Sequence, residues 1–308
     1  MDYLKANVLN QKFLTEGAFY RIELEGKSYH CRGLARICRR DSKADIANAL
    51  VVMVNPGSSQ PTDKEYVIPP YHENLMEIPM VEASSDQTQH QLMRLMEFRG
   101  WDMIYIINLS DLIEGNLASF QDALNAFRNN ENHEHSIFSP NRREQINKLL
   151  SKNTKMIVGW GVQPIMKKEM YEALMILEEH GKVIGVRHQT PPYYLHPKPA
   201  LIEDRIQWLV HMKKLLDSEK QRKKLENDIS LSIVREILKD IHGRMGLEDE
   251  FRSIHPKVQV EMYERWIEVV SMKLYQEGMI DEVYEPINMD EMSFGEIVNR
   301  TVHYLSFD

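Results

Sequence analysis

Four short apolar segments separated by helical patterns constrain the fold of this chain more than any other feature. They cover residues 49–54, 103–108, 155–161 and 182–186. Apolar runs of this length are typical of strands that are buried on both faces of a sheet. Strands that alternate with helices indicate βαβ units. The pattern therefore predicts an α/β fold with a doubly wound parallel sheet.

Helical patterns fill the segments between these strands. Ser84 and Gln87 fit a capping box at the start of one expected helix, which ends at Gly100. Further helices are expected over residues 140–151, 164–180 and 202–216.

Two less regular segments complete the first part of the chain. Residues 18–24 and 28–38 have the pattern of two strands joined by a turn at residues 25–27, which predicts an opening hairpin. The proline-rich segment 61–83 is long for an irregular connection inside a domain. Such connections are often functional, so a lid or a binding loop is expected there.

Beyond about residue 217 the pattern changes to amphipathic helices without strand signals. The expected helices cover residues 219–242, 257–277 and 292–305. We therefore expect two domains, an α/β domain over residues 1–217 and a small all-α region over residues 218–308. A core of this size supplies roughly 3–5 kcal/mol of stability. The apolar stripes are accordingly expected to pack on the α/β domain, on a second copy or on another protein.

The composition favours a cytoplasmic protein. The 308 residues contain no apolar run that approaches the length of about 18 residues needed to cross a membrane. The N-terminus lacks the basic and apolar stretches of a signal peptide. Cys31 and Cys38 could form a disulfide or half of a metal site, but two buried thiols are expected in the cytoplasm. No metal and no cofactor are expected, because His133 and His135 fit a mobile polar loop better than a metal site.

The net charge of −8 opposes strong binding to duplex DNA, which depends on the neutralisation of phosphates. Positive charge nevertheless gathers over residues 32–43 and 213–224, whereas the tail beyond Gly278 is acidic. Each run is most simply a solvated face. Within the first run, Arg39 and Arg40 are candidate ligands of DNA phosphates if they line the mouth of a cleft.

Polar residues follow the expected strands at one edge of the sheet. Asn55-Pro56-Gly57 follows the first strand, Asn108 ends the second, and His196 lies beyond the fourth. Because ligands bind at the carboxyl ends of the strands in doubly wound sheets, these residues are expected to converge on one cleft.

Each of these residues also has a plain structural interpretation. Asn55-Pro56-Gly57 could be only a turn, Asn108 a cap, and His196 an incidental loop residue. Trp160 is expected in the core, and Asp86 fits the N-cap of a helix as well as it fits a ligand of the site.

Four motifs occur in an order and at a spacing that resemble a known family. They are "MVNPGSSQP", "IYIINLS", "IVGWG" and "HPKPAL". Over about residues 45–215 the sequence resembles the uracil-DNA glycosylase superfamily, which implies a doubly wound sheet of that type. It resembles still more closely an uncharacterised bacterial family of single domains with N-P-S, V-N-L, A-W-G and H-P motifs.

The resemblance implies two catalytic residues and a base-binding pocket. Asn55 would hold the attacking water, and His196 would donate a hydrogen bond to the base oxygen that gains charge as the glycosidic bond breaks. Pro56 and Gly57 would shape a turn that approaches the ligand closely. Asn108 would read the edge of an extruded base. A stacking ring would come from one of two tyrosines, Tyr66 or Tyr71.

The same resemblance implies contacts with DNA phosphates through Ser58 and Lys198. Lys198 stands where the main branch of the superfamily has a serine, and Ala200 stands where it has an intercalating leucine. These differences argue against uracil specificity and duplex invasion.

The resulting prediction is a hydrolase that resembles a DNA glycosylase and removes a damaged or phage-modified base, in DNA repair or antiviral defence. Two alternatives are a non-catalytic module that binds a nucleotide or modified base for a protein partner, and a hydrolase of free nucleosides or nucleotides. DNA, a second copy or another protein is the expected partner, and no membrane is.

Overall fold

The computed structural model describes residues 3–72, 77–150, 155–226, 229–244, 246–280 and 283–305. The chain divides into two compact units, Met1–Leu216 and Asp217–Asp308, which we call the α/β unit and the helical unit. Most of the basic run predicted at 213–224 has side chains outside this description, and Asp281 and Glu282 of the acidic tail also lie outside the described residues.

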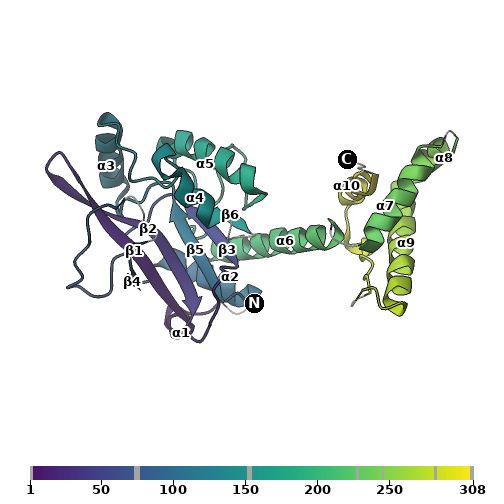
Figure 1. Cartoon of the computed structure of the whole chain (residues 1–308), viewed down its shortest axis with the longest axis horizontal. Coiled ribbons are helices and arrows are strands. Elements are labelled where there is room, and N and C mark those ends of the chain that lie inside the picture. Colours follow the sequence, from purple (N-terminus) through teal and green to yellow (C-terminus); the bar gives the residue numbers. More distant parts are fainter. Residues whose placement is uncertain are drawn as a thin grey trace. The chain divides into compact units, whose positions relative to one another are not determined.

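A seven-stranded mixed sheet forms the centre of the α/β unit, with the strand order β4-β1-β2-β5-β3-β6-β7 (Figure 1). The strands are β1 (Phe13–Leu24), β2 (Lys27–Arg39), β3 (Ala49–Met53), β4 (Met80–Glu82), β5 (Met103–Asn108), β6 (Met156–Val158) and β7 (Val183–Ile184). The four apolar segments of the sequence form the parallel half, β5-β3-β6-β7, as predicted.

The other half of the sheet is antiparallel, so the sheet is mixed, and the strands predicted at the start of the chain form its hairpin. Strands β1 and β2 pair over almost their whole length, and β2 then pairs with β5 in antiparallel fashion. The hairpin turns at Glu25 and Gly26, which have φ angles of 51° and 73°. Two positive φ angles in a two-residue loop match the twist of paired strands. The short connection therefore imposes antiparallel pairing.

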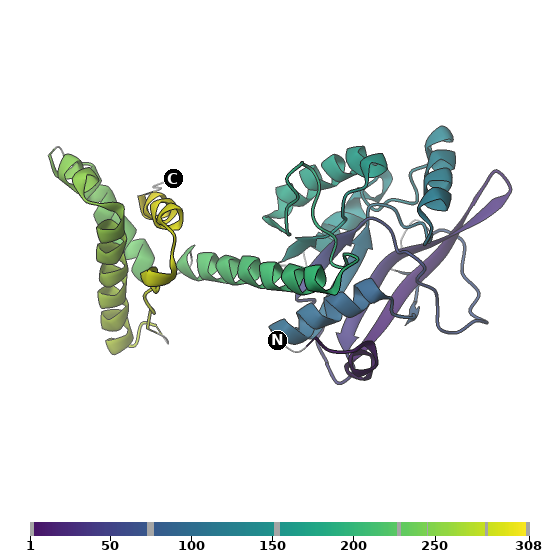
Figure 2. The ribbon, with the colours of Figure 1, turned by 180° about the vertical axis from the view of Figure 1, so that it is seen from behind.

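Helices cover both faces of the sheet (Figures 1 and 2). One face, which we call the α2 face, packs against α1 (Ala6–Lys12), α2 (Gln87–Arg99) and the first half of α6 (Ile202–Glu226). The opposite face, the α5 face, packs against α3 (Leu117–Asn129), α4 (Arg143–Leu150) and α5 (Lys167–His180). Short 3-10 helices span Pro140–Arg142, Pro164–Met166 and Met289–Glu291.

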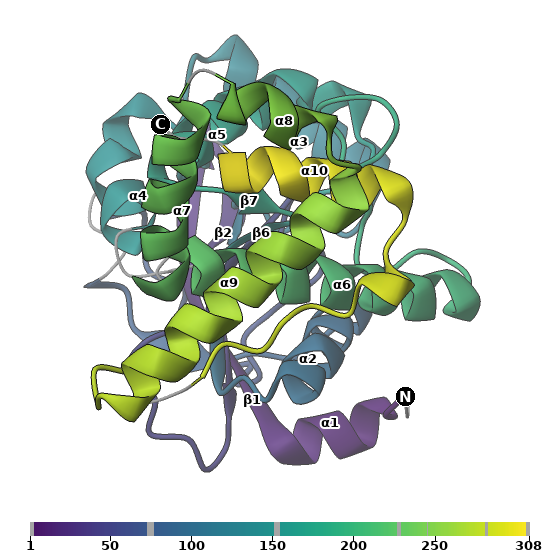
Figure 3. The same cartoon turned by 90° about the vertical axis from the view of Figure 1, so that its right-hand side faces the viewer.

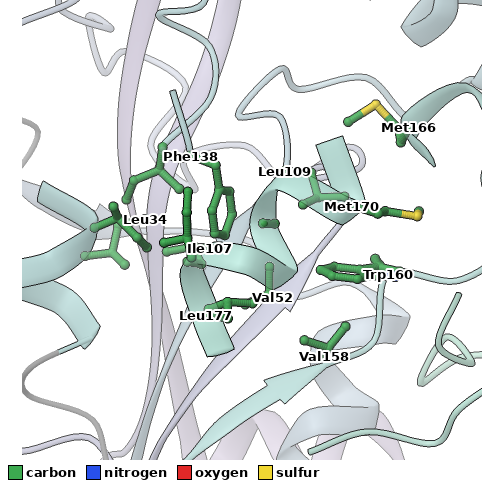
Figure 4. Packing of buried hydrophobic residues seen from close by; sticks show 14 of the residues in the cluster. Leu34, Val52, Ile107, Leu109, Phe138, Val158, Trp160, Met166, Met170 and Leu177 are labelled. Carbon is green, nitrogen blue, oxygen red and sulfur yellow. The ribbon is translucent and has the colours of Figure 1, made fainter. Parts of the chain in front are cut away.

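Strict alternation along β3 explains why this strand reads as continuously apolar. Val51 and Met53 belong to the core on the α2 face, whereas Leu50 and Val52 belong to the core on the α5 face. Figure 4 shows Val52 among the buried side chains of that second core, with Leu177 of α5 nearby. A strand that is buried on both sides has no polar face, as expected for the centre of a doubly wound sheet.

Helix α2 begins two residues later than the sequence pattern predicts. Its N-cap is Asp86, whose side chain accepts a hydrogen bond from the backbone N of Gln89 at 2.8 Å. The side chain of Gln89 in turn accepts a hydrogen bond from the backbone N of Asp86, also at 2.8 Å. A capping box is thus present, but Asp86 and Gln89 form it in place of Ser84 and Gln87.

The helical unit contains α7 (Ile229–His242), α8 (Leu247–Ser253), α9 (Pro256–Gln276) and α10 (Phe294–Leu305) (Figure 3). Helices α7, α9 and α10 enclose a core of their own, which includes Leu238, Tyr263 and Tyr304. Glu264 is buried among these side chains and accepts hydrogen bonds from the hydroxyls of Tyr284 and Tyr304. The helices predicted over 257–277 and 292–305 correspond closely to α9 and α10, whereas the helix predicted over 219–242 is divided between α6 and α7.

Two further features concern membrane-spanning helices and the two cysteines. Within the described part of the chain, no helix has both the length and the apolar character of a membrane span. Cys31 is buried and Cys38 is half-buried, and neither takes part in a disulfide.

Candidate functional site

The turn after β3 is held by a side-chain hydrogen bond and by a left-handed residue. The side-chain amide of Asn55 donates to the carbonyl O of Glu114 at 2.7 Å. Pro56 is buried, and Gly57 has a φ angle of 66°, which favours glycine. This geometry explains why a buried strand ends in these three residues. Within the described residues nothing donates to Oδ1 of Asn55, so its carbonyl group is available to a ligand.

Asn108 ends β5 and pairs with Met53 of β3 across the parallel ladder. It is 0% exposed, and neither its Oδ1 nor its Nδ2 has a hydrogen-bond partner among the described residues. Asn108 follows Ile104 and Ile106 in the alternation of β5, which places it on the α2 face. A buried polar group without a partner costs about 1–3 kcal/mol. An ordered water molecule or a ligand could supply the missing hydrogen bonds of this amide.

Arg32 is a second buried polar residue on the same face, and the sequence prediction missed it. The side chain is 3% exposed, and its Nε and Nη1 atoms have no partner among the described residues. Its Cδ lies 3.1 Å from the position that a Cβ would take at Gly17. Burial lowers the pKa of Arg32 to about 10, while the charges of Asp86 and Asp111 act in the opposite direction. A charged residue inside an apolar strand pattern was the available sequence signal.

His196 lies in the loop before α6, packed against the turn that follows β6. Its Cβ is 3.4 Å from the position that a Cβ would take at Gly161, so glycine permits this approach. Burial lowers the pKa of His196 and keeps the ring neutral near pH 7. The backbone N of Lys198 donates to Nδ1 at 3.1 Å. Nδ1 also lies 3.3 Å from the carbonyl O of Lys198. In the tautomer in which Nδ1 accepts from the backbone N of Lys198, the proton is on Nε2, which can then donate to a ligand.

Asp86 connects the turn with His196. Its Oδ2 lies 3.6 Å from the position that a Cβ would take at Gly57. Burial lowers the pKa values of both Arg32 and His196, and the negative charge of Asp86 opposes this lowering at both residues. The candidate site therefore combines half-buried residues around the turn, which we call the rim, with buried residues on the α2 face, which we call the floor. The rim is Asn55, Gly57, Asp86 and His196, and the floor is Arg32 and Asn108.

The two candidate stacking tyrosines lie on opposite faces of the sheet. Tyr71 packs on Tyr20 in the core of the α5 face, with ring centroids 5.5 Å apart, so it is not part of the rim. Tyr66 packs beside Phe19, whose ring borders Gly17 next to Arg32. Tyr66 is therefore the tyrosine that lies on the side of the site.

Arg39 and Arg40 lie at the other end of the strands. Arg39 follows Cys38, which pairs with Met103 at the start of β5, whereas Asn108 stands at its end. Arg39 forms an ion pair with Glu97 at 2.8 Å, and Nε of Arg40 donates to a backbone carbonyl of α1. The structure thus does not bring these arginines to the site. Arg39 borders a separate cleft of about 670 Å³ with both acidic and basic walls.

Of the remaining predicted residues, Ser58 and Lys198 lie in loops beside the site. Ser58 is exposed, and its Cβ lies 3.3 Å from the position that a Cβ would take at Gly115. Lys198 is half-buried next to His196. Trp160 is buried and donates from Nε1 to the carbonyl O of Pro192 at 3.0 Å, so it belongs to the core, as predicted (Figure 4).

A separate buried network, absent from the sequence prediction, supports the end of β5 on the α5 face. Asp111 and Arg142 form an ion pair at 2.6 Å with both side chains 0% exposed. The hydroxyl of Tyr20 donates to Asp111 at 2.8 Å. His135 is buried beside this network and lies 3.0 Å from Oγ of Ser110 through Nδ1. The prediction that His135 belongs to a mobile polar loop was therefore wrong, although His133 is exposed.

Burial of His135 predicts a loss of stability at acidic pH. Burial lowers the pKa of His135 to about 3, whereas an unfolded histidine has a pKa of about 6.5. Between these values the unfolded state binds the additional proton, so stability is complete above pH 6.5 and falls as the pH falls. Urea unfolding at pH 7.5 and 5.0 is expected to differ by about 2 kcal/mol from this residue alone.

The control for this prediction is an exposed histidine of helix α6, His211, which does not act on the pKa of His135. His135→Gln is expected to reduce the loss of stability on acidification, and His211→Gln is expected to leave it unchanged. His90 and His196 also have lowered pKa values. They therefore contribute part of the loss of stability at acidic pH in every variant. An identical pH dependence in wild type and His135→Gln would contradict the prediction.

Among the residues that the structure describes, no group of three or more His, Cys, Asp or Glu side chains could hold a metal ion. The side chains of the candidate site supply two amides, one imidazole, one guanidinium and one carboxylate.

Comparison with known proteins identifies one similarity. Residues 80–197 match the family described as "Protein of unknown function (DUF1643)". The matched segment contains Asp86, Asn108 and His196, and it begins after the turn that carries Asn55. No curated protein and no solved structure matches the chain.

Proposed function

We propose that the α/β unit binds a nucleobase and hydrolyses the N-glycosyl bond that joins it to a sugar, in the manner of a DNA glycosylase. The substrate class is DNA with a damaged or modified base. The observation that supports this proposal most strongly is the buried, unpartnered amide of Asn108 at the end of β5. One amide presents a donor and an acceptor side by side, which complements the edge of a base.

Arg32 extends the donor set of the floor. Its unpaired Nε and Nη1 atoms offer two N–H groups in a fixed geometry. The negative charge of Asp86 acts on Arg32 against the effect of burial on its pKa. A carboxylate in the site disfavours a phosphate group, so we expect a neutral ligand. A base that carries carbonyl oxygens satisfies these donors.

His196 suits the departure of the base. As the glycosidic bond breaks, electrons move onto the base, and a carbonyl oxygen of the base gains negative charge. The Nε2–H of a neutral His196 can donate to that oxygen. A positioned donor of this kind typically accelerates a reaction by about 10²–10³-fold.

The distribution of positive charge favours a single-stranded or already extruded nucleotide over a tightly bound duplex. Lys198 is the basic residue next to His196, whereas Arg39 and Arg40 lie at the far end of the strands. Fewer phosphate contacts give weaker binding with a weaker salt dependence.

The experiment that tests the proposal is base release from a panel of single- and double-stranded oligonucleotides, each with one modified base. Mass spectrometry detects the free base, and alkali cleavage detects the abasic site. Release from DNA supports the proposal. Release from nucleosides alone would support a nucleoside hydrolase, and binding without release from any substrate would support a non-catalytic module.

For the helical unit we propose self-association. Helix α7 carries a row of exposed isoleucines, Ile229, Ile233 and Ile237, while its opposite side packs in the core. Residues four apart lie on one side of a helix, so these side chains form a continuous apolar stripe. A second copy can cover the stripe through the same surface, as in symmetric dimers.

Light scattering tests this proposal. Wild-type protein is expected to have a mass above that of the 36.2 kDa chain, and Ile233→Glu is expected to restore the monomer mass because it buries a charge in the contact. Ser232→Glu adds the same charge at an exposed neighbouring position and is expected to remain associated. A monomeric wild type, or association that survives Ile233→Glu, would contradict self-association through α7.

A further inference from the structure

Asp86 has two carboxylate oxygens with different surroundings. Oδ1 accepts the hydrogen bond from the backbone N of Gln89 that caps α2. Oδ2 faces the turn after β3, 3.6 Å from the position that a Cβ would take at Gly57. The residue is half-buried, so a ligand in the site can reach it. Capping of the helix therefore occupies one oxygen and leaves the other directed at the turn.

Asp86 also acts electrostatically on several other side chains of the site. Its negative charge acts on Arg32 of β2, on His196 of the loop before α6 and on His90 of α2. Among the described residues with a perturbed pKa, Asp111 affects Arg32 but is absent from the charges that act on His196. Asp86 is therefore the carboxylate that faces both the floor and the rim.

The other side chains of the site do not act as the base in the proposed reaction. The amides of Asn55 and Asn108 are not bases, and the guanidinium of Arg32 is protonated. The proposed function uses His196 as a donor, with its proton on Nε2 and with Nδ1 accepting from the backbone N of Lys198. Hydrolysis by these residues alone would rely on neutral water. A carboxylate beside the turn removes this restriction.

We propose that Asp86 is the general base of the site, an inference that rests on the proposed function. Asn55 holds a water molecule through Oδ1, and Oδ2 of Asp86 takes one proton from that water. The oxygen of the water bonds to the anomeric carbon, the bond from this carbon to the base nitrogen breaks, and its electron pair leaves with the base. The base then takes up one proton as Asp86 releases one, so the products are a sugar hydroxyl and a neutral base.

Two substitutions separate this role from capping. Asn and Ser are as effective as Asp at an N-cap, so Asp86→Asn and Asp86→Ser retain the helix start. Asparagine cannot accept the proton, and Asp86→Asn is expected to lower kcat by about 10²–10⁴-fold with little change in KM. Asp86→Ser leaves room for a small carboxylate, so added formate is expected to restore part of its rate.

The matched control is Asp102→Asn. Asp102 is exposed and immediately precedes the start of β5, so it lies at the end of this strand away from Asn108. It is expected to keep the wild-type rate. Circular dichroism and thermal midpoints check that each variant is folded.

The outcomes distinguish this inference from the proposed function. Base release by wild type that persists in folded Asp86→Asn at an unchanged kcat would overturn the role of Asp86 alone. A lowered kcat in Asp86→Ser without any response to formate would also count against a base. Absence of base release by wild type on the whole panel would overturn both proposals.

Discussion

Asn55→Ala is expected to reduce base release by at least about 10²-fold while the fold remains intact. The substitution removes the carbonyl oxygen that is available at the turn, and with it the acceptor that positions the water. It also removes the hydrogen bond to Glu114, which costs about 1 kcal/mol of stability. Release from the best substrate of the oligonucleotide panel measures the rate, and urea unfolding measures the stability.

Asn116→Ala is the control for this prediction. Asn116 caps α3 two residues after Glu114 and accepts hydrogen bonds from the backbone N atoms of Ala118 and Ser119. Its loss costs about 1 kcal/mol as well, but it removes no group of the proposed site. The variant is expected to release base at the wild-type rate. A folded Asn55→Ala protein with wild-type activity would refute the role of Asn55.

Arg142→Met is expected to have the largest effect on stability, a loss of about 3–5 kcal/mol. The substitution leaves the carboxylate of Asp111 buried without its ion-pair partner. Because Asp111 follows the end of β5 by three residues, the same variant is expected to loosen the floor of the site. The midpoint of urea unfolding, with the slope held common to all variants, gives the change in free energy.

The adjacent arginine gives a matched comparison. Arg143 pairs with Glu179, but these side chains are 39% and 59% exposed. Arg143→Met is therefore expected to cost less than about 1 kcal/mol. Each single change, Asp111→Asn or Arg142→Met, leaves one buried charge without its partner, whereas the double variant removes both charges. The double variant is therefore expected to cost less stability than the sum of the two single changes. Equal effects of Arg142→Met and Arg143→Met would contradict this assignment of the buried pair.

The parallel half of the sheet could be predicted because its strands are buried on both faces. Residues 103–108 were predicted as a strand with the bounds that β5 has in the structure. The antiparallel half was harder to predict, since the order of strands in a sheet depends on which edges meet after the hairpin forms. Nothing local in β1 or β2 indicates that β2 pairs with β5.

The sequence suggested candidate site residues where a polar group coincides with the end of an apolar strand. Asn55 and Asn108 stand out because each interrupts an apolar pattern, and the structure places them at the ends of paired strands. Arg32 was missed because its burial depends on the pairing of β2 with its neighbours, which local sequence does not reveal. Arg39 and Arg40 were assigned to the site because they belong to a basic run of the sequence. The sequence does not show that these two residues lie at the end of the strands away from the site.

The two interpretations of Asp86 illustrate the same limit. The sequence fits an N-cap and a ligand-binding residue equally well, and in the structure one oxygen of Asp86 serves as the cap. Only the fold reveals that the second oxygen lies beside Gly57, because residues 57 and 86 are separated by the long segment 61–83.

The unpartnered amide of Asn108 is central to this account, and a crystal structure with a bound base tests it most directly. Crystals of the Asn55→Ala variant would be soaked with the base that the panel releases, or with uracil and hypoxanthine. We expect the edge of the base to lie within about 3.2 Å of both Oδ1 and Nδ2 of Asn108, with Nε2 of His196 donating to a carbonyl oxygen of the base. A base bound elsewhere, with the amide of Asn108 still unpaired, would contradict it.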